Sequence, residues 1–238
     1  MIWSYYLCGL LCILLVALFV PAGHWLHREL TTHGKTSGAV RFPRCQVPKT
    51  AFRYFYAIGL LSAIVTLKLE APCERLFVLH LLRRLLETIW WPYSDSSQMH
   101  LIHAIVGLSY YPILVLAMAA SSQHYRTLQP GDYLLLAALS ALQSYVHYTL
   151  WRQRRPQRHG KSVHVPVADR HPWLFGLTLS PHYFAEIGIY GLFSSLTAWS
   201  FLMCWNLAFV ALNLLVSARH TAIWYRDRFP KAICKPII

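Results

Sequence analysis

The sequence predicts an all-α integral membrane protein with about seven transmembrane helices. Of its 238 residues, 56% are hydrophobic and only 13% are charged, whereas a soluble domain usually has about 25% charged residues. An aromatic content of 14% excludes a disordered chain, which has few aromatic residues. Several apolar stretches are long enough to cross a bilayer core of about 30 Å, which takes about 20 helical residues.

The first predicted helix covers residues 2–23, which carry no charged side chain. No basic segment precedes it and no small-residue cleavage site follows it, so we expect an uncleaved anchor rather than a signal peptide. Six more apolar stretches follow, at residues 52–69, 76–91, 99–120, 133–151, 181–199 and 201–218. Charged residues crowd the ends of 52–69 and interrupt 76–91, so these two stretches are the weakest candidates for spanning helices.

The basic residues are distributed unevenly between the two sides of the predicted bundle. Seventeen Lys and Arg residues follow the first, fifth and seventh predicted helices, whereas Lys68, Arg75 and Arg126 lie on the opposite side. By the positive-inside rule, the richer side faces the cytosol. We therefore expect a multi-pass protein with its N-terminus outside the cytosol and its C-terminus in the cytosol. The bilayer, rather than nucleic acid, is the expected partner of a chain with this net charge of +13.

The chain is predicted to form one multi-helix membrane domain over residues 1–238. No internal repeat or low-complexity tract divides it. Within residues 152–180, Pro156, Pro166 and Pro172 have a spacing that favours an irregular cytosolic loop over a helix.

The cysteine and histidine patterns predict no metal site and no disulfide framework. The six cysteines include no CxxC pair and no His/Cys cluster at the spacing of a zinc site. HxxH pairs occur at residues 24–27 and 100–103, but the clustered histidine boxes of di-iron membrane hydroxylases are absent from the sequence.

Ionisable residues inside predicted spanning helices are functional candidates, because charges are costly in lipid. Arg83, Arg84 and Glu87 lie in the 76–91 stretch, with Arg83 one turn before Glu87. Two interpretations stay open. The residues form a charge pair that reaches towards an interface, or they form an inward-facing site for a cofactor phosphate or a substrate head group.

Two further stretches carry polar side chains at helical spacing. Gln143 and His147 are one turn apart, and Arg154 follows two turns later on the same face. A polar face that ends in arginines suits a long anionic ligand, because guanidinium groups bind phosphate. The alternative, anchoring of this helix at the cytosolic surface, would explain the arginines but not Gln143 or His147. His182 and Glu186, again one turn apart, lie where the N-terminus of a helix favours an anion, although a structural histidine is the alternative there.

Several motifs recur in one known family. They are QSYVH at 143–147 with Arg154, VHVP at 163–166, WLF at 173–175, SPHYFAEI at 180–187, Asn213, Ser217 and WY at 224–225, with fainter matches in HGKT at 33–36, VPK at 47–49 and LRRL at 82–85 with Glu87. With these motifs the chain resembles the steroid 5-alpha-reductase family and, within it, the polyprenol (polyprenal) reductase branch. The resemblance implies a seven-helix reductase of the endoplasmic reticulum membrane that uses NADPH.

The resemblance also implies site residues. By matching positions, the cofactor site consists of Gln143, His147, Arg154, His164, His182, Glu186 and Asn213, with Arg84 nearby. Tyr54 and Phe55 fall where the second helix of the family meets the substrate carbonyl, and we expect Phe55, Arg84 and Glu87 to contact the substrate. Steroid-reducing members have a Glu near the position of Phe55, so its absence argues against a steroid substrate.

The chain departs from the branch at two places. Ala222 stands where the branch usually has a His, and the nearest histidine is His220. The closing segment, residues 226–238, is also shorter than that of the family. Both departures concern the cofactor contacts that the C-terminal segment would make.

The chemistry of hydride addition narrows the substrate. Hydride from a nicotinamide adds readily to a carbon–carbon double bond only when a carbonyl withdraws charge, so the alcohol polyprenol is not the reactive form. We therefore predict that polyprenal, a long-chain isoprenoid aldehyde, is reduced at its α-isoprene unit to dolichal, in the synthesis of dolichol for protein N-glycosylation. The enzyme must orient the cofactor and donate a hydrogen bond to the developing enolate oxygen. Tyr54 is the first candidate donor.

Two other functions stay open. An isoprenylcysteine-type methyltransferase, faintly indicated by RHP at 170–172, would bind S-adenosylmethionine and ignore NADPH. A non-catalytic lipid-binding protein would tolerate alanine at each polar helix position with little effect beyond stability. Fold alone does not decide among the three.

Overall fold

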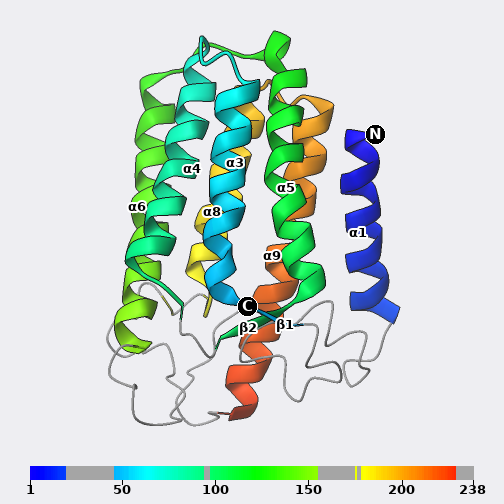
Figure 1. Cartoon of the computed structure of the whole chain (residues 1–238), viewed down its shortest axis with the longest axis vertical. Coiled ribbons are helices and arrows are strands. Elements are labelled where there is room, and N and C mark those ends of the chain that lie inside the picture. Colours follow the sequence, from blue (N-terminus) through cyan, green and yellow to red (C-terminus); the bar gives the residue numbers. More distant parts are fainter. Residues whose placement is uncertain (20–45, 94–96, 155–174, 176–177, 229–238) are drawn as a thin grey trace.

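Seven α-helices make up most of the residues that the structure describes, which are 1–19, 46–93, 97–154, 175 and 178–228 of a computed structural model (Figure 1). They are α1 (Ile2–Phe19), α3 (Phe52–Thr66), α4 (Pro72–Trp90), α5 (Leu101–Ala120), α6 (Pro130–Arg154), α8 (Pro181–Leu196) and α9 (Phe201–Arg228). Each helix coincides with one of the seven apolar stretches, so the predicted helices are confirmed. Helix α6 continues to Arg154, so its last three residues fall in the segment 152–180 for which a loop was predicted, and most of that segment lies outside the described residues.

Successive helices run in opposite directions, so that α1, α4, α6 and α9 all end at the same side of the bundle (Figure 1). Two helical segments, Leu101–Ala120 and Phe201–Asp227, have the length and hydropathy to cross a membrane. Large apolar side chains are also exposed on other helices, among them Leu61, Val65 and Leu134. A surface of this kind suits lipid better than water. The number of seven spans stays a prediction.

A short antiparallel sheet joins two connections at one end of the bundle (Figure 1). Its strands are β1 (Gln46–Pro48) and β2 (Gln98–His100), with Val47 opposite Met99. A single-turn 3-10 helix, Lys49–Ala51, follows β1, and a second one, Ser122–His124, lies in the connection between α5 and α6. The sequence analysis did not predict the sheet, because strands of three residues are too short to show an alternating pattern.

Small residues let α3 and α5 approach each other closely. A Cβ added at Gly59 of α3 would lie 2.7 Å from Cβ of Tyr111 on α5. A Cβ added at Gly107 of α5 would lie 2.3 Å from the ring of Phe55 on α3. This contact fixes the rotation of α3 about its axis, and it turns Phe55 and Tyr56 into the bundle, where both are buried.

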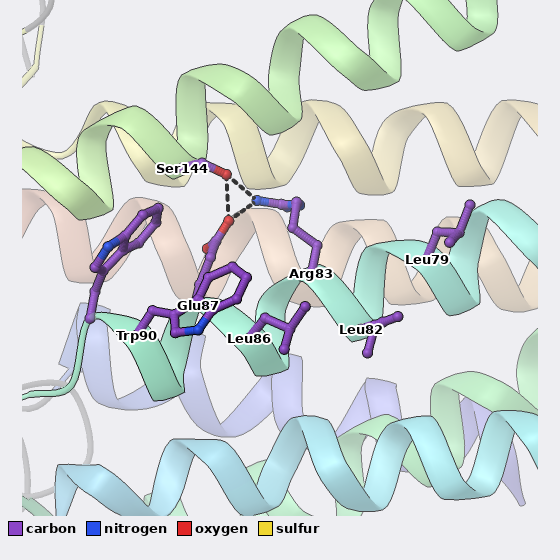
Figure 2. Close-up of a pocket in the computed structure, with 8 residues that line it drawn as sticks. Leu79, Leu82, Arg83, Leu86, Glu87, Trp90 and Ser144 are labelled. Atoms are coloured by element: carbon purple, nitrogen blue, oxygen red, sulfur yellow. Dashed lines mark hydrogen bonds and ion pairs between the residues drawn. The ribbon is translucent and has the colours of Figure 1, made fainter.

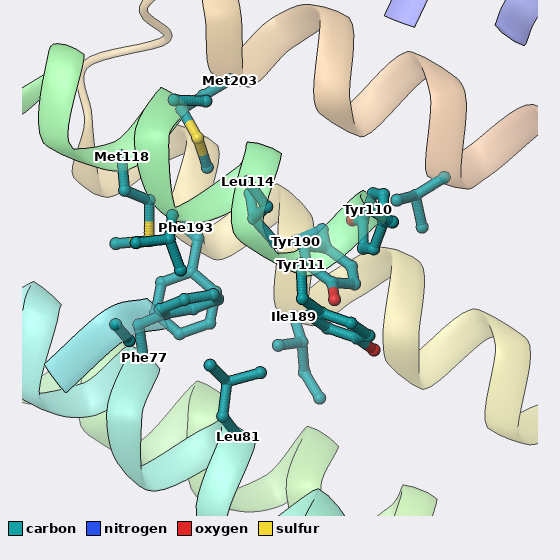
Figure 3. Close-up of a cluster of buried hydrophobic side chains, with 14 of the residues drawn as sticks. Phe77, Leu81, Tyr110, Tyr111, Leu114, Met118, Ile189, Tyr190, Phe193 and Met203 are labelled. Atoms are coloured by element: carbon teal, nitrogen blue, oxygen red, sulfur yellow. The ribbon is translucent and has the colours of Figure 1, made fainter. Parts of the chain in front are cut away.

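An apolar core lies where α4, α5, α8 and α9 meet (Figure 3). The rings of Phe77 and Phe193 pack edge to face with centroids 5.3 Å apart. Leu114, Met118 and Met203 fill the space beside them and are fully buried. Burial of such side chains stabilises a fold by about 1.5–3 kcal/mol each where the alternative is water.

Arg126 holds three segments together at the end of the bundle opposite the sheet. Its guanidinium group forms a bidentate pair with Asp132 at the start of α6, at 2.7 and 2.8 Å. It also donates hydrogen bonds to the carbonyl oxygen and the hydroxyl of Ser195 near the end of α8, at 3.1 and 3.0 Å. The loop after α5 is thereby tied to both following helices.

Candidate functional site

A buried charged cluster lies between α4, α6 and α8. On α4, Arg84 and Glu87 are buried, whereas Arg83 keeps 22% of its side chain exposed. The Glu87 carboxylate forms ion pairs with both guanidinium groups and accepts a hydrogen bond from Ser144 Oγ on α6. A carboxylate in apolar surroundings requires partners of this kind, because an unpaired buried charge is costly.

Gln143 of α6 connects α4 with α8. Its side chain is fully buried. Its Oε1 accepts a hydrogen bond from Arg83 Nη2 at 2.6 Å, and its Nε2 donates one to Glu186 Oε2 of α8 at 2.9 Å. The amide oxygen thus accepts from the arginine and the amide nitrogen donates to the carboxylate, and these two bonds fix the orientation of the side-chain amide.

His147 lies one turn beyond Gln143 on α6 and faces the same cluster. Its Nδ1 is 2.7 Å from Arg84 Nη1 and 3.0 Å from Glu87 Oε2. On the other side, its ring packs against the ring of His182 at the start of α8, with centroids 5.3 Å apart. The two histidines thus bring the N-terminal end of α8 to the edge of the cluster.

Arg84 extends the cluster across the bundle to α3. Its Nη2 donates a hydrogen bond to the hydroxyl of Tyr56 at 2.7 Å, and its guanidinium carbon lies 4.9 Å from the centre of that ring. Tyr56 is buried. A single guanidinium group therefore contacts Glu87, His147 and a buried phenol at once, an arrangement that its five donors in a planar fork suit well.

An open groove between α4 and α6 leads from the outside of the bundle to this cluster (Figure 2). Its volume is about 270 Å³. The walls are apolar and consist of Leu79, Leu82, Leu86, Trp90 and Trp91. At the floor, Ser144 of α6 meets the polar side chains of α4 that line the groove (Figure 2). An apolar chain with one polar end matches this lining.

Comparison with known proteins identifies the family. The family model described as 3-oxo-5-alpha-steroid 4-dehydrogenase matches residues 114–233, which include α6, α8 and α9. The chain belongs to this steroid 5-alpha-reductase family. The family resemblance that the sequence motifs indicated is therefore confirmed.

The relatives of this family member include enzymes named polyprenal reductase. The chain is 26% identical to the polyprenal reductase of Caenorhabditis elegans over 85% of its own length and 82% of that protein. It is 28% identical to the polyprenal reductase of Saccharomyces cerevisiae over 79% of its length and 72% of that protein. Polyprenal reductase 2 of Arabidopsis thaliana is 26% identical over 65% of this chain and 55% of that protein.

Six of the predicted site residues of this family member come together in the structure. They are Arg84 and Glu87 on α4, Gln143 and His147 on α6, and His182 and Glu186 on α8. Arg84 and Glu87 lie inside the bundle, and Arg83 and Arg84 make hydrogen bonds with side chains of a neighbouring helix; the ligand-binding role of this group stays a prediction.

Other predicted site residues lie apart from the cluster or outside the described residues. Tyr54 is 52% exposed, and its hydroxyl accepts a hydrogen bond from the neighbouring Arg53. Asn213 is exposed on α9. Arg154 ends α6, and His164 lies outside the described residues.

Two further residues have packing positions. Phe55 is buried, and its ring packs against the ring of Phe52 at 5.0 Å and against α5 at Gly107. Ala222, where the branch usually has a histidine, is buried in a small apolar cluster with Leu179 and Tyr225.

Tyr56, which was not predicted from the sequence, contacts the cluster in place of Tyr54. Two residues of helix correspond to a rotation of about 200°, so these two tyrosines point to nearly opposite sides of α3. The buried positions of α3 include Tyr56, Gly59 and Ala63, which have helical spacing. That spacing, with a glycine in the stripe, was the available signal for the inward face.

Proposed function

We propose that this protein is a membrane-embedded, NADPH-dependent reductase of the α-isoprene double bond of polyprenal. It acts as a single domain over residues 1–238 in the endoplasmic reticulum membrane. Family membership supports reduction of a double bond, and the relatives named polyprenal reductase support a long-chain isoprenoid substrate. The observation that carries the proposal is the buried charged cluster, because charges kept inside an apolar bundle are expected to serve a ligand.

The cluster fits the nicotinamide part of the cofactor. The formal charges of Arg83 and Arg84 are balanced by those of Glu87 and Glu186. A neutral carboxamide, which both donates and accepts hydrogen bonds, suits such a balanced site better than a phosphate does. Within the described residues, the Nε atoms of both arginines are buried without a hydrogen-bond partner, so donors remain for a ligand.

The phosphates of NADPH suit the end of α6 instead. That helix runs from the cluster to an exposed Arg152 and ends at Arg154, and guanidinium groups bind phosphate in a bidentate manner. In this proposal, the residues that hold the nicotinamide side are Gln143, His147, His182 and Glu186. Arg154, His164 and Asn213 are proposed to hold the remainder of the cofactor.

The groove between α4 and α6 suits the isoprenoid chain. When bound, NADPH supplies the hydride for the β-carbon of the unsaturated aldehyde. The apolar walls of the groove hold the chain and exclude water from it, while Arg83, Ser144 and Glu87 at the floor receive its polar end. A lipid substrate can therefore reach the cluster from the side of the bundle without crossing water.

The proposal is tested by NADPH-dependent conversion of polyprenal to dolichal by the purified protein in detergent. We expect His182→Ala to raise the KM for NADPH at least about tenfold, since it removes a contact at the proposed cofactor site. The matched control is His124→Ala, which changes an exposed histidine of a connecting turn. We expect the control to stay within about twofold of the wild type, as for a surface change away from the site.

Two outcomes would contradict the proposal. One is a folded protein that turns over neither polyprenal nor polyprenol but consumes S-adenosylmethionine, which would favour the methyltransferase. The other is a folded protein without any turnover in which both histidine variants behave alike, which would favour a non-catalytic lipid-binding protein. Turnover of a steroid enone instead of polyprenal would keep the family chemistry and change the substrate.

A further inference from the structure

We propose that Tyr56, held in place by Arg84, donates the proton to the carbonyl oxygen of the substrate. This inference rests on the proposed function and assigns its acid to a specific residue. The sequence pointed to Tyr54 for this role, and the structure places a different tyrosine of the same helix beside the charged cluster.

The hydrogen bond between Arg84 and Tyr56 leaves the phenolic proton available. A guanidinium group can only donate hydrogen bonds, so the hydroxyl of Tyr56 is the acceptor in the 2.7 Å contact with Arg84 Nη2. The side chain of Tyr111 is a second hydrogen-bond partner of this phenol. A hydroxyl oxygen can accept two hydrogen bonds and keep its own donor, so with Arg84 and Tyr111 as donors the O–H of Tyr56 can be donated to an oxygen that enters the site.

Packing fixes the position of the phenol. Tyr56 is 4% exposed, and its ring contacts the ring of Tyr111 with centroids 5.1 Å apart. The guanidinium carbon of Arg84 lies 4.9 Å from the centre of the Tyr56 ring, within the range of a cation–π contact. Because the phenol is already held on two sides, little further entropy is lost in ordering it when the transition state forms. Catalysis by preorganised donors depends on this property.

One guanidinium group links this phenol to the groove. Arg84 Nη1 pairs with Glu87, which lines the groove, and Arg84 Nη2 pairs with Tyr56. The lining of the groove includes Glu87 but neither Arg84 nor Tyr56, so the proposal requires the aldehyde to move past Glu87 to reach the phenol. The isoprenoid chain stays in the apolar groove, so only the short head group enters the charged region.

The proposed reduction begins with hydride addition and ends with the conversion of an enol to the aldehyde. A hydride equivalent forms a new C–H bond at the β-carbon, and the π electrons of the double bond shift towards the carbonyl oxygen. Tyr56 transfers its O–H proton to that oxygen, which gives an enol and a phenolate. The positive charge of Arg84 stabilises the phenolate until it takes a proton from solvent. The enol then gains a proton at the α-carbon and loses its O–H proton, which yields the saturated aldehyde, with NADPH oxidised to NADP⁺.

Tyr54 provides a matched control on the same helix. It is two residues away, has the same side chain and is 52% exposed, with its hydroxyl bonded to Arg53. The experiment compares Tyr56→Phe with Tyr54→Phe in the NADPH-dependent conversion of polyprenal by the purified protein in detergent. Binding of NADPH and the thermal unfolding midpoint are measured for both variants.

We expect Tyr56→Phe to lower kcat by about 100-fold or more, in the range for loss of a general acid, with the Kd of NADPH within about threefold of the wild type. Tyr54→Phe is expected to keep kcat within about twofold, as for an exposed surface position. A stable Tyr56→Phe variant that binds NADPH and keeps its kcat would overturn the proposal. Loss of kcat in Tyr54→Phe alone would return the role to Tyr54.

A second measurement covers the case in which Tyr56→Phe fails to fold. Replacement of Tyr56 by a difluorotyrosine keeps the shape of the side chain and makes its phenol more acidic. If Tyr56 is the donor, the alkaline limb of the kcat–pH profile moves to lower pH, and an unchanged profile would overturn the proposal. A wild-type protein that turns over no polyprenal would instead contradict the proposed function itself, and with it the donor role.

Discussion

The same two helices, α4 and α8, contribute to two buried regions of opposite character. Towards one end of the bundle, Phe77 of α4 and Phe193 of α8 pack in the apolar core (Figure 3). Towards the other end, Glu87 of α4 and Glu186 of α8 belong to the charged cluster. The apolar core is closed and its stability depends on filled volume, whereas the charged cluster is reached by the open groove and depends on matched charges and hydrogen bonds.

This difference determines which substitutions each region tolerates. An apolar core accepts a side chain of similar volume, because dispersion and burial have no fixed direction. A cluster of buried charges depends on each partner, because removal of one partner leaves the others unpaired. The protein therefore has a charged cluster, whose burial is energetically costly, next to an apolar core that stabilises the fold.

The largest expected effect is that of Glu87→Gln, which changes charge with almost no change in shape. The substitution removes the anion that pairs with both arginines. Breaking a buried ion pair costs about 3–5 kcal/mol, and we expect a loss of that size in the free energy of unfolding in detergent.

The matched control for Glu87→Gln is Glu70→Gln, since Glu70 is exposed. We expect this control to change stability by less than about 0.5 kcal/mol. Equal effects of the two substitutions would show that the charged cluster does not stabilise the fold.

A somewhat smaller effect is expected from substitutions of Leu114, which is fully buried in the apolar core. Leu114→Ala leaves a cavity and is expected to cost about 2–5 kcal/mol, whereas Leu114→Met keeps the volume and should cost less than about 1.5 kcal/mol. Thermal unfolding of both variants, with Leu134→Ala at an exposed position as the control, measures the difference. A Leu114→Met variant as unstable as Leu114→Ala would mean that this core requires a specific shape as strictly as the cluster requires its charges.

The smallest expected effect concerns a charge pair outside both regions, at the end of the bundle opposite the sheet. Hydrogen bonds from Arg126 lower the pKa of Asp132 to about 2, from an ordinary value of 3.8. The carboxylate therefore contributes its stabilisation fully above about pH 4 and loses it as the pH falls towards 2. Because the pair is partly exposed, we expect Asp132→Asn to cost less than about 1 kcal/mol near neutral pH.

The prediction for Asp132→Asn is tested by the pH dependence of the unfolding free energy. The difference in unfolding free energy between the wild type and Asp132→Asn should shrink as the pH is lowered from about 4 to about 2. A difference that stays constant over this range would show that the ionised carboxylate is not the source of the stabilisation.

The sequence predicted the helices and much of the cluster for one reason. Charged and amide side chains are costly inside apolar stretches, so Glu87, Gln143 and Glu186 were conspicuous where they stand. The rotation of α3 was not predictable in the same way. It depends on the close approach of α5 at Gly59, which decides that Tyr56 rather than Tyr54 faces inward.

The proposed function requires that hydride is delivered to the carbon–carbon double bond of polyprenal at the charged cluster. The most direct test incubates the purified protein with polyprenal and NADPH deuterated at the transferable position of the nicotinamide, followed by mass spectrometry and NMR of the product. We expect dolichal with one deuterium at the β-carbon, and no such product from Gln143→Leu, which removes the amide between Arg83 and Glu186. Deuterium at the aldehyde carbon, with the double bond intact, would contradict the proposed function.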